Sequence, residues 1–342
     1  SQVVGSGSTQ ITIDPSSDFA GETEYYVQID ATAFDDPFGY SFAGISDTTT
    51  LSFTTWKTGP TISSFSYPTA ITEWTKILGT SSDETSQGLT SGSDGSIYMA
   101  GVTSGNLNGQ TNIGSNDGFI SKFSADGDLD WTTLWGTATS EYYSDVAADQ
   151  DGMIFASGST NYGIYETQAT IVGVTESSAY SNGVSRSLTE MFGGNAYDSA
   201  TGITIGPDDH IYICGFTNSA SLNGEGTNIP FDGAGSHRDG FISKYTKSGD
   251  EVWTRIFGVS DIQETPLEIK TASDGSIYMT GYTTGVLDGQ TYNGGFTDAF
   301  ISKFSSEGDL DWTRLLGNTS KDRGNALIIG SDGSIYIAGH TS

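Results

Sequence analysis

Carboxylates at alternate positions are the residues of this sequence with the clearest chemical potential. The turn Asp126-Gly127-Asp128-Leu129-Asp130 recurs as Glu307-Gly308-Asp309-Leu310-Asp311. Alternating carboxylates can converge on Ca²⁺, which takes about six to eight oxygen ligands. The candidate metal ligands are therefore Asp126, Asp128, Asp130, Asp309 and Asp311, and Ca²⁺ is the one candidate cofactor. The pattern lacks the spacing and the distal Glu of an EF-hand, so a hairpin turn with exposed acids is the simpler interpretation.

No residue set in the sequence forms a catalytic pattern. His210, His237 and His340 are far apart and lack metal-ligand spacing. Residues 124–131 have the length of a sialidase Asp-box, but the Gly is displaced and Asp replaces Thr. The five arginines do not group by sequence, and there is neither a Gly-x-Ser-x-Gly elbow nor a phosphate-cradling loop. We therefore expect no catalytic residues and a protein that is not an enzyme.

The charge excludes several classes of partner. The chain has 42 acidic and 13 basic residues, which give a net charge of −29. Nucleic-acid binding needs a basic surface that neutralises phosphates, and an anionic membrane surface is disfavoured for the same reason. No run of about 18 apolar residues exists, so we expect no membrane insertion. The acids are scattered, which indicates a solvated, self-repelling surface. Cys214 is the only cysteine, lies in an apolar run and is expected in the core.

A repeated phrase organises most of the chain. Asp-Gly-Ser-Ile-Tyr begins at residues 94, 274 and 332, with weaker copies at 151 and 208, so the spacings are 57, 57, 66 and 58 residues. Two further phrases keep step with it. Asp-(Gly/Ala)-Phe-Ile-Ser-Lys-(Phe/Tyr) begins at 117, 239 and 298, and a Trp-Thr phrase begins at 74, 131, 253 and 312. Because these four Trp residues hold one repeat position, we expect them to pack between strands rather than to stack on sugars.

Each repeat holds about four apolar runs of strand length, separated by Asp-Gly, Glu-Gly and Ser-Gly dipeptides that suit hairpin turns. A four-stranded unit in tandem is typical of a propeller blade. A linear β-solenoid is the competing fold, but its turns are usually shorter. The sequence therefore predicts an all-β protein with a β-propeller of about five visible blades, the last of them incomplete. Residues 161–187 lack a clear Phe-Ile-Ser-Lys-Phe phrase, which predicts an irregular blade or an inserted loop.

In these three phrases, residues 71–342 resemble the bacterial SBBP-type β-propeller repeat family. The resemblance implies a propeller of about seven blades in a large secreted or surface protein, and it brings no catalytic motif. The last repeat stops before its Phe-Ile-Ser-Lys-Phe phrase, so we expect either further chain or a neighbour to complete it, and we favour further chain.

The first 57 residues do not share the repeat. Pro15, the Tyr-x-Val-x-Ile run at 25–29 and the Phe-Thr-Thr run at 53–55 resemble the C-terminal part of a bacterial Ig-like surface-protein domain. Such a sandwich needs about seven strands, so only part of one is expected here. Residues 58–70 are the predicted linker, and 71–342 the predicted propeller.

These features favour a non-enzymatic structural or adhesion module of a large secreted or cell-surface bacterial protein, in a filament or matrix. Its expected partners are other protein subunits, surface or matrix components, or further copies of itself, and its expected location is extracellular or at the cell surface. The alternative is a carbohydrate-binding or carbohydrate-active propeller, as a lectin, glycoside hydrolase or lyase. A glycan array with a hydrolysis screen would separate the two.

Overall fold

The computed structural model describes residues 2–4, 12–14, 24–26, 52–54 and 74–342, apart from 162–166, 177–183, 220, 224, 227–237 and 260–261. The chain divides into two compact units, residues 1–72 and 73–342. In the first unit, β1 (Gln2–Val4) pairs antiparallel with β2 (Thr12–Asp14). In the same way, β3 (Glu24–Tyr26) pairs with β4 (Ser52–Thr54). The rest of the predicted Ig-like segment lies outside the described residues.

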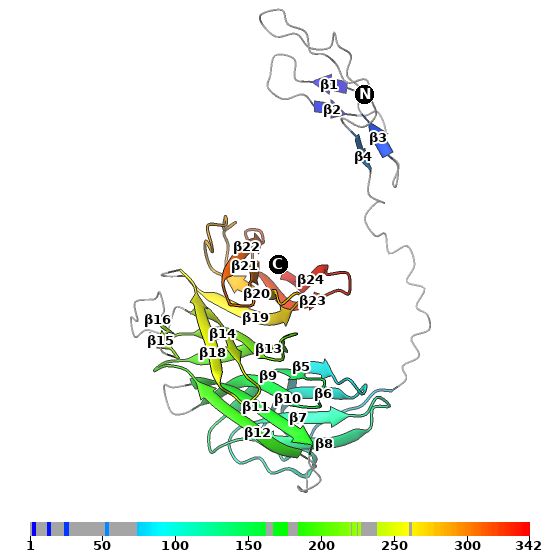
Figure 1. The fold of residues 1–342 in the computed structure, drawn as a ribbon, viewed down its shortest axis with the longest axis vertical. Coiled ribbons are helices and arrows are strands. Elements are labelled where there is room, and N and C mark those ends of the chain that lie inside the picture. Colours follow the sequence, from blue (N-terminus) through cyan, green and yellow to red (C-terminus); the bar gives the residue numbers. More distant parts are fainter. Residues whose placement is uncertain are drawn as a thin grey trace, which may run out of the picture. The chain divides into compact units, whose positions relative to one another are not determined.

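The second unit is built from antiparallel four-stranded sheets, which we call blades (Figure 1). Blade 1 consists of β5 (Glu84–Ser91), β6 (Ile97–Thr103), β7 (Asp117–Phe123) and β8 (Leu129–Trp135). Blade 2 consists of β9 (Glu141–Ala148), β10 (Ile154–Asn161), β11 (Thr167–Glu176) and β12 (Val184–Phe192). A single 3₁₀ turn, η1 (Leu107–Gly109), is the only helical element among the described residues.

Two more blades and a two-stranded sheet follow along the chain. Blade 3 consists of β13 (Asp198–Ile205), β14 (Ile211–Thr217), β17 (Asp239–Tyr245) and β18 (Glu251–Phe257), with the small pair β15 (Ser221–Leu222) and β16 (Glu225–Gly226) beside it. Blade 4 consists of β19 (Glu264–Thr271), β20 (Ile277–Thr283), β21 (Asp298–Phe304) and β22 (Leu310–Leu316). The last sheet pairs β23 (Asp322–Ile329) with β24 (Ile335–Thr341).

The blades follow one another in a propeller-like arrangement. The first strand of each blade contacts the first strand of the next, from β5 to β9, β13, β19 and β23. Each of these strands carries a register shift at the same position, as between Ser86 and Gly88 in β5 or between Pro266 and Glu268 in β19. Bulges of this kind raise the local twist of a strand. The predicted all-β class and four-stranded units are confirmed, whereas closure into a ring stays a prediction.

The Asp-Gly-Ser phrase forms the turn between the first and second strands. The side chain of Asp94 accepts a hydrogen bond from the backbone N–H of Ser96 at 2.9 Å, and Gly95 takes a φ of +81°. Glycine suits this left-handed conformation because it has no Cβ. In blade 3 the turn contains Asp209 instead, which holds a φ of +64°. The repeated phrase therefore encodes a tight hairpin turn.

The Phe-Ile-Ser-Lys-Phe phrase forms the third strand, which is buried on both faces in blades 1 and 3. The hydroxyl of its serine bonds the threonine hydroxyl of the neighbouring Trp-Thr phrase at 2.8–2.9 Å in blades 1, 3 and 4. These pairs are Ser121–Thr132, Ser243–Thr254 and Ser302–Thr313. Each pair satisfies two buried hydroxyls at once, and this explains why both residue types recur in step.

Apolar clusters fill the seams between blades. Between blades 3 and 4, Tyr212, Cys214 and Trp253 pack with Ile277 and Met279. The predicted core position of Cys214 is confirmed, since its side chain is fully buried. The Trp residues pack on the repeated Tyr, with ring centroids 6.1 Å apart for Trp131–Tyr98 and for Trp253–Tyr212. This confirms the expected packing role of those tryptophans.

Two copies of the repeat depart from its phrases. Residues 74–79 carry the first Trp-Thr phrase, but no strand pairs with them in the described structure and they do not form a strand. Trp74 nevertheless lies against Gly127 as Trp253 lies against Gly308. In blade 2, β11 fills the third-strand position without the Phe-Ile-Ser-Lys-Phe phrase, because Thr, Val and Ile residues still supply strand propensity and buried side chains.

Candidate functional site

In blades 1, 3 and 4, a lysine of the third strand lies opposite the tyrosine of the second strand. Lys122 pairs with Tyr98, Lys244 with Tyr212 and Lys303 with Tyr278 in the strand register. The ammonium of Lys122 lies 5.8 Å from the ring centroid of Tyr98, and that of Lys244 lies 5.2 Å from Tyr212. Both distances suit a cation–π contact. The repeat therefore builds a cationic side chain into each of these blades.

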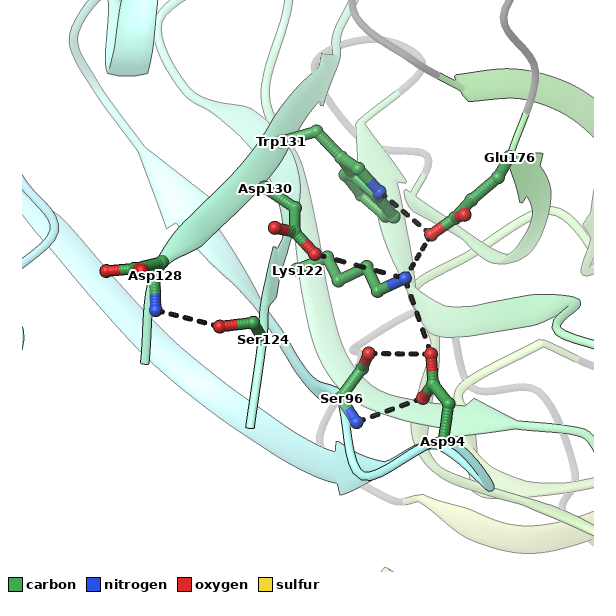
Figure 2. A network of polar contacts seen from close by, with 8 residues as sticks. All are labelled: Asp94, Ser96, Lys122, Ser124, Asp128, Asp130, Trp131 and Glu176. Carbon is green, nitrogen blue, oxygen red and sulfur yellow. Dashed lines mark hydrogen bonds and ion pairs between the residues drawn. The ribbon is translucent and has the colours of Figure 1, made fainter. Parts of the chain in front are cut away.

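Carboxylates surround Lys122 (Figure 2). Its Nζ lies 3.7 Å from Asp94 Oδ2 and 4.0 Å from Asp130 Oδ2, and it donates a hydrogen bond to Glu176. Burial opposes charging of this lysine, but the bond to Glu176 and the nearby charges outweigh it and raise the pKa of Lys122. Trp131 Nε1 also donates to Glu176, at 3.3 Å. Since Glu176 belongs to blade 2, the network ties two blades together.

Ion pairs form at the corresponding lysines of blades 3 and 4. Lys244 Nζ lies 2.7 Å from Asp208, and Lys303 Nζ lies 3.2 Å from Asp311. At Asp208, burial acts to raise the carboxyl pKa, but the hydrogen bond from Lys244 and other contacts lower it overall. These three lysines therefore pair with carboxylates of their own blade or of the next blade.

The predicted metal ligands are all exposed and are not brought together. Asp128 forms an ion pair with Lys76 at 3.1 Å. In Figure 2, Asp130 points toward Lys122 and Asp128 points away from it. Asp311 faces Lys303, and Asp309 sits in the turn where its N–H bonds Ser305. Asp126 is exposed in the equivalent turn of blade 1. Within the described residues no group of three or more His, Cys, Asp or Glu side chains could hold a metal ion. Calcium binding stays a prediction.

The seam between blades 1 and 2 contains a polar cavity of about 310 Å³. Beside Lys122 and Tyr98, its lining includes four carboxylates, from Asp94, Asp149, Asp151 and Glu176. Three of these come from blade 2 and were not singled out from the sequence, because only the packing of two blades brings them to Lys122. The excess of acid suits hydroxyl-rich or cationic ligands.

A second lysine joins blades 2 and 3 on the side of the Asp-Gly turns. Lys247 Nζ lies 2.7 Å from Asp149, 2.5 Å from Asp209 and 3.5 Å from Asp151. The side chain of Asp149 is 1% exposed and also accepts the backbone N–H groups of Asp151 and Met153, so Lys247 is the charged partner of a buried carboxylate. Burial opposes the charged form of Lys247, but its hydrogen bonds to Asp149 and Asp209 raise its pKa.

The apolar face of blade 1 is open, whereas the same face of later blades is covered. It forms a cavity of about 460 Å³, lined in part by Ile97, Met99 and Leu89. Leu89 is 69% exposed, but Ile269, which holds the same register position in blade 4, is fully buried. Ile77, on the segment that follows Trp74, is 95% exposed. This face therefore has the composition of a blade–blade seam but lacks a complete partner among the residues that the structure describes.

Comparisons with known proteins add little to this geometry. No family model matches the chain. The regulatory protein FlaEY of Caulobacter vibrioides is 26% identical over 143 residues, which cover 40% of this chain and only 15% of that protein. Two solved structures are similar at 13% and 11% identity, with TM-scores of 0.38 and 0.40. The first is a protein of unknown function from Bacteroides caccae, covering 64% of this chain and 61% of its own. The second is a gluconolactonase from Xanthomonas campestris, covering 74% and 69%. Neither likeness is strong enough to carry an argument about chemistry. No helix in the described residues has the length and apolarity to cross a membrane.

Proposed function

We propose that this chain is a non-enzymatic, propeller-like assembly module of a large secreted or cell-surface protein, related to the SBBP-type repeats. It acts in adhesion or in building a filament or matrix, and its partners are other protein subunits or further copies of itself. The open apolar face of blade 1 carries the proposal. A face with the composition of a blade–blade seam can pack against another sheet. Exposed contiguous apolar surface also commonly marks an interaction site.

The internal use of polar residues supports the same proposal. The repeated lysines pair with carboxylates of their own or neighbouring blades, as Lys122, Lys244 and Lys303 do. The repeated tryptophans pack against tyrosines. Residues of this kind hold the blades together. The proposed contacts with partners therefore use the outer surfaces of the blades and not a reactive centre.

Sedimentation velocity over a concentration series tests the proposal. The native chain should form species larger than a monomer, since burying Ile77 and Leu89 would each contribute about 2 kcal/mol. The double variant Ile77→Glu/Leu89→Glu should remain monomeric. Ile113→Glu is the matched control, because Ile113 is also 67% exposed but does not line this face. A native chain that stays a small dispersed monomer and coats neither cells nor matrix would count against the proposed function.

The second candidate function is carbohydrate binding at the seam between blades 1 and 2. The specific observation is the cavity of about 310 Å³, where four carboxylates face Tyr98 and Lys122. Carboxylates accept hydrogen bonds from sugar hydroxyls, and paired carboxylates also serve in glycoside hydrolysis. A glycan array with a hydrolysis screen tests this candidate. Glycan binding that Glu176→Gln abolishes, with the melting temperature unchanged, would support carbohydrate binding. The absence of both glycan binding and hydrolysis by the native chain would rule this candidate out as the function.

A further inference from the structure

Blade 2 departs from the other blades at one position of its third strand. In blades 1, 3 and 4 the first phenylalanine of this strand lies opposite a glycine of the second strand, in the pairs Phe119–Gly101, Phe241–Gly215 and Phe300–Gly281. In blade 2 the same register places Thr170 opposite Gly158. Both blades at this seam have all four strands. Because threonine is much smaller than phenylalanine, blade 2 brings less side-chain volume to its seam with blade 1.

In the seams of blades 3 and 4 the phenylalanine fills the space beside the preceding blade. Phe241 is fully buried and packs on Phe192, the last residue of β12, with ring centroids 5.7 Å apart. Phe300 is also fully buried and packs on Phe257, the last residue of β18, at 6.3 Å. The third strand therefore normally contributes one aromatic ring to each seam.

The seam between blades 1 and 2 has a different aromatic pair. Trp135 ends β8 as Phe192 ends β12, and it packs on Tyr143 of β9 with ring centroids 6.5 Å apart. Tyr143 holds the position of Ala200 in blade 3, since each lies opposite the glycine of the second strand. Its ring lies against Gly118, where a Cβ would be 2.7 Å away. Even with this ring in place, a cavity of about 190 Å³ remains among the described residues.

Apolar side chains form much of the cavity wall. These are Trp135, Tyr143, Val172 and Met191. Glu141 also lines the cavity, but its carboxylate is already bonded within the protein. It accepts hydrogen bonds from the backbone N–H and the hydroxyl of Thr137, both at 2.7 Å, and from the hydroxyl of Thr139 at 3.1 Å. Its oxygens are therefore occupied by donors of the protein itself.

A buried hydroxyl in the wall has no partner among the described residues. Thr160 lines the cavity and is 6% exposed, but its hydroxyl forms no hydrogen bond within that part of the chain. The threonine at the same position of blade 1, Thr103, donates to Glu84 at 2.8 Å, and the one in blade 3 is likewise bonded. A buried polar group without a partner is costly, so Thr160 is suited to bond a ligand.

A cationic side chain lies over the aromatic part of the wall. The guanidinium of Arg186, on β12, lies 6.0 Å from the ring centroid of Trp135 and forms no ion pair with a carboxylate of the described residues. Guanidinium presents planar N–H donors that match a carboxylate in a bidentate pair. A cationic ligand is disfavoured here, because Arg186 already occupies the cation position over the indole ring.

We propose that this cavity binds a small aromatic carboxylate. Its ring takes the place of the absent third-strand phenylalanine, and its carboxylate accepts hydrogen bonds from Arg186 and Thr160. A cavity of about 150 Å³ accepts benzene, so about 190 Å³ can hold one ring with a small substituent. The site goes beyond the proposed assembly function, since it shares no lining residue with the open face of blade 1 or with the polar cavity around Lys122.

Isothermal titration calorimetry of the full 342-residue protein with sodium benzoate tests the proposal, with sodium chloride keeping the ionic strength constant. We expect saturable binding, and at least tenfold weaker binding of the neutral analogue benzyl alcohol. Arg186→Gln should weaken benzoate binding at least tenfold and leave benzyl alcohol binding unchanged. Arg314→Gln is the matched control, because Arg314 lies over Trp312 at a similar distance of 5.7 Å but does not line the cavity.

Thr170→Phe should also weaken benzoate binding at least tenfold without lowering the melting temperature, because its ring would fill the cavity. Melting temperatures check that all variants fold, and Arg186→Gln decides the matter if Thr170→Phe does not fold. The Ile77→Glu/Leu89→Glu variant should bind benzoate as the native chain does, so the two proposals can fail separately. No saturation up to about 10 mM benzoate would overturn the inference. Equal binding of benzyl alcohol, or undiminished binding by folded Thr170→Phe, would overturn it as well.

Discussion

An acidic residue begins the first strand of every blade and of the last two-stranded sheet, and two of these residues have pKa shifts in opposite directions. These residues are Glu84, Glu141, Asp198, Glu264 and Asp322. At Glu84, burial acts to raise the pKa, but bonds from the Thr80 backbone and hydroxyl and from Thr103 lower it overall. At Glu264, burial and then the charge of Asp239 raise the pKa to about 8. At this one repeat position, the pKa is therefore lowered in Glu84 and raised in Glu264.

Glu264 should make the protein less stable as the pH rises. Its folded-state pKa lies above the unfolded value of about 4.3, so protonation stabilises the fold fully below that value, and the stabilisation is lost as the pH rises through about 8. Glu264→Gln mimics the protonated acid. We expect its free energy of unfolding to exceed that of the native chain by a few kcal/mol at about pH 9 and to converge with it at about pH 4.

Urea denaturation across this pH range measures the effect. Glu84→Gln provides the control at the equivalent position of blade 1. Because the pKa of Glu84 is lowered, its ionised form stabilises the fold above the unfolded value, and the variant should be less stable than the native chain at neutral pH. The same sign for both variants would show that Glu264 is not held in its neutral form.

At the scale of elements, the seams combine apolar packing with a few bridging charges. Blade 2 is connected to blade 1 through Glu176 and Lys122, and to blade 3 through Asp149 and Lys247. Asp145 of β9 also accepts the N–H of Ile203 in β13 at 3.0 Å. Burial, then the charge of Glu268 on β19, raise the pKa of Asp145 to about 6. Inter-blade contacts therefore place buried charge close to the first strands.

Lys247 is expected to contribute strongly to stability because it neutralises a buried carboxylate. Lys247→Met should lower the free energy of unfolding by about 3 kcal/mol, since Asp149 would lose its partner at a 1% exposed site. Lys76→Met should cost less than about 0.5 kcal/mol, because the pair of Lys76 with Asp128 is solvent-exposed. Denaturant melts of both variants make the comparison. Equal losses would show that the buried pair contributes no more to stability than the exposed one.

At the scale of the whole molecule, the net charge of −29 sets the response to salt. Like charges repel over the Debye length, which falls from about 30 Å at 0.01 M to about 8 Å at 0.15 M ionic strength. Repulsion opposes the compact state, so added salt should raise the melting temperature by several degrees. Sodium and potassium chloride should act alike at equal ionic strength. A flat or falling melting temperature would show that weakening of the ion pairs outweighs relief of repulsion.

Much of the architecture was predictable because the determinants are local. Asp-Gly-Ser turns, Phe-Ile-Ser-Lys-Phe strands and Trp-Thr strands recur with a fixed spacing, and turn chemistry and strand period act over a few residues. The packing of Trp131 and Trp253 and the core position of Cys214 followed from position alone. The exception is β11, which lacks the Phe-Ile-Ser-Lys-Phe phrase. It still forms a strand, because its Thr, Val and Ile residues have high strand propensity and bury their side chains.

The repeat, the four-stranded sheets and the excess of acid can all be predicted from the sequence. The contacts between particular carboxylates and lysines cannot, because they depend on how the blades pack. Asp130 and Asp311, expected as metal ligands, face Lys122 and Lys303, and Asp149, Asp151 and Glu176 join the first seam. The structure alone also showed that, among the described residues, the face carrying Leu89 lacks the cover that Ile269 has in blade 4. The physical reason is that pairing, burial and cavities arise between segments far apart in the chain, whereas turns and strand periodicity arise within them.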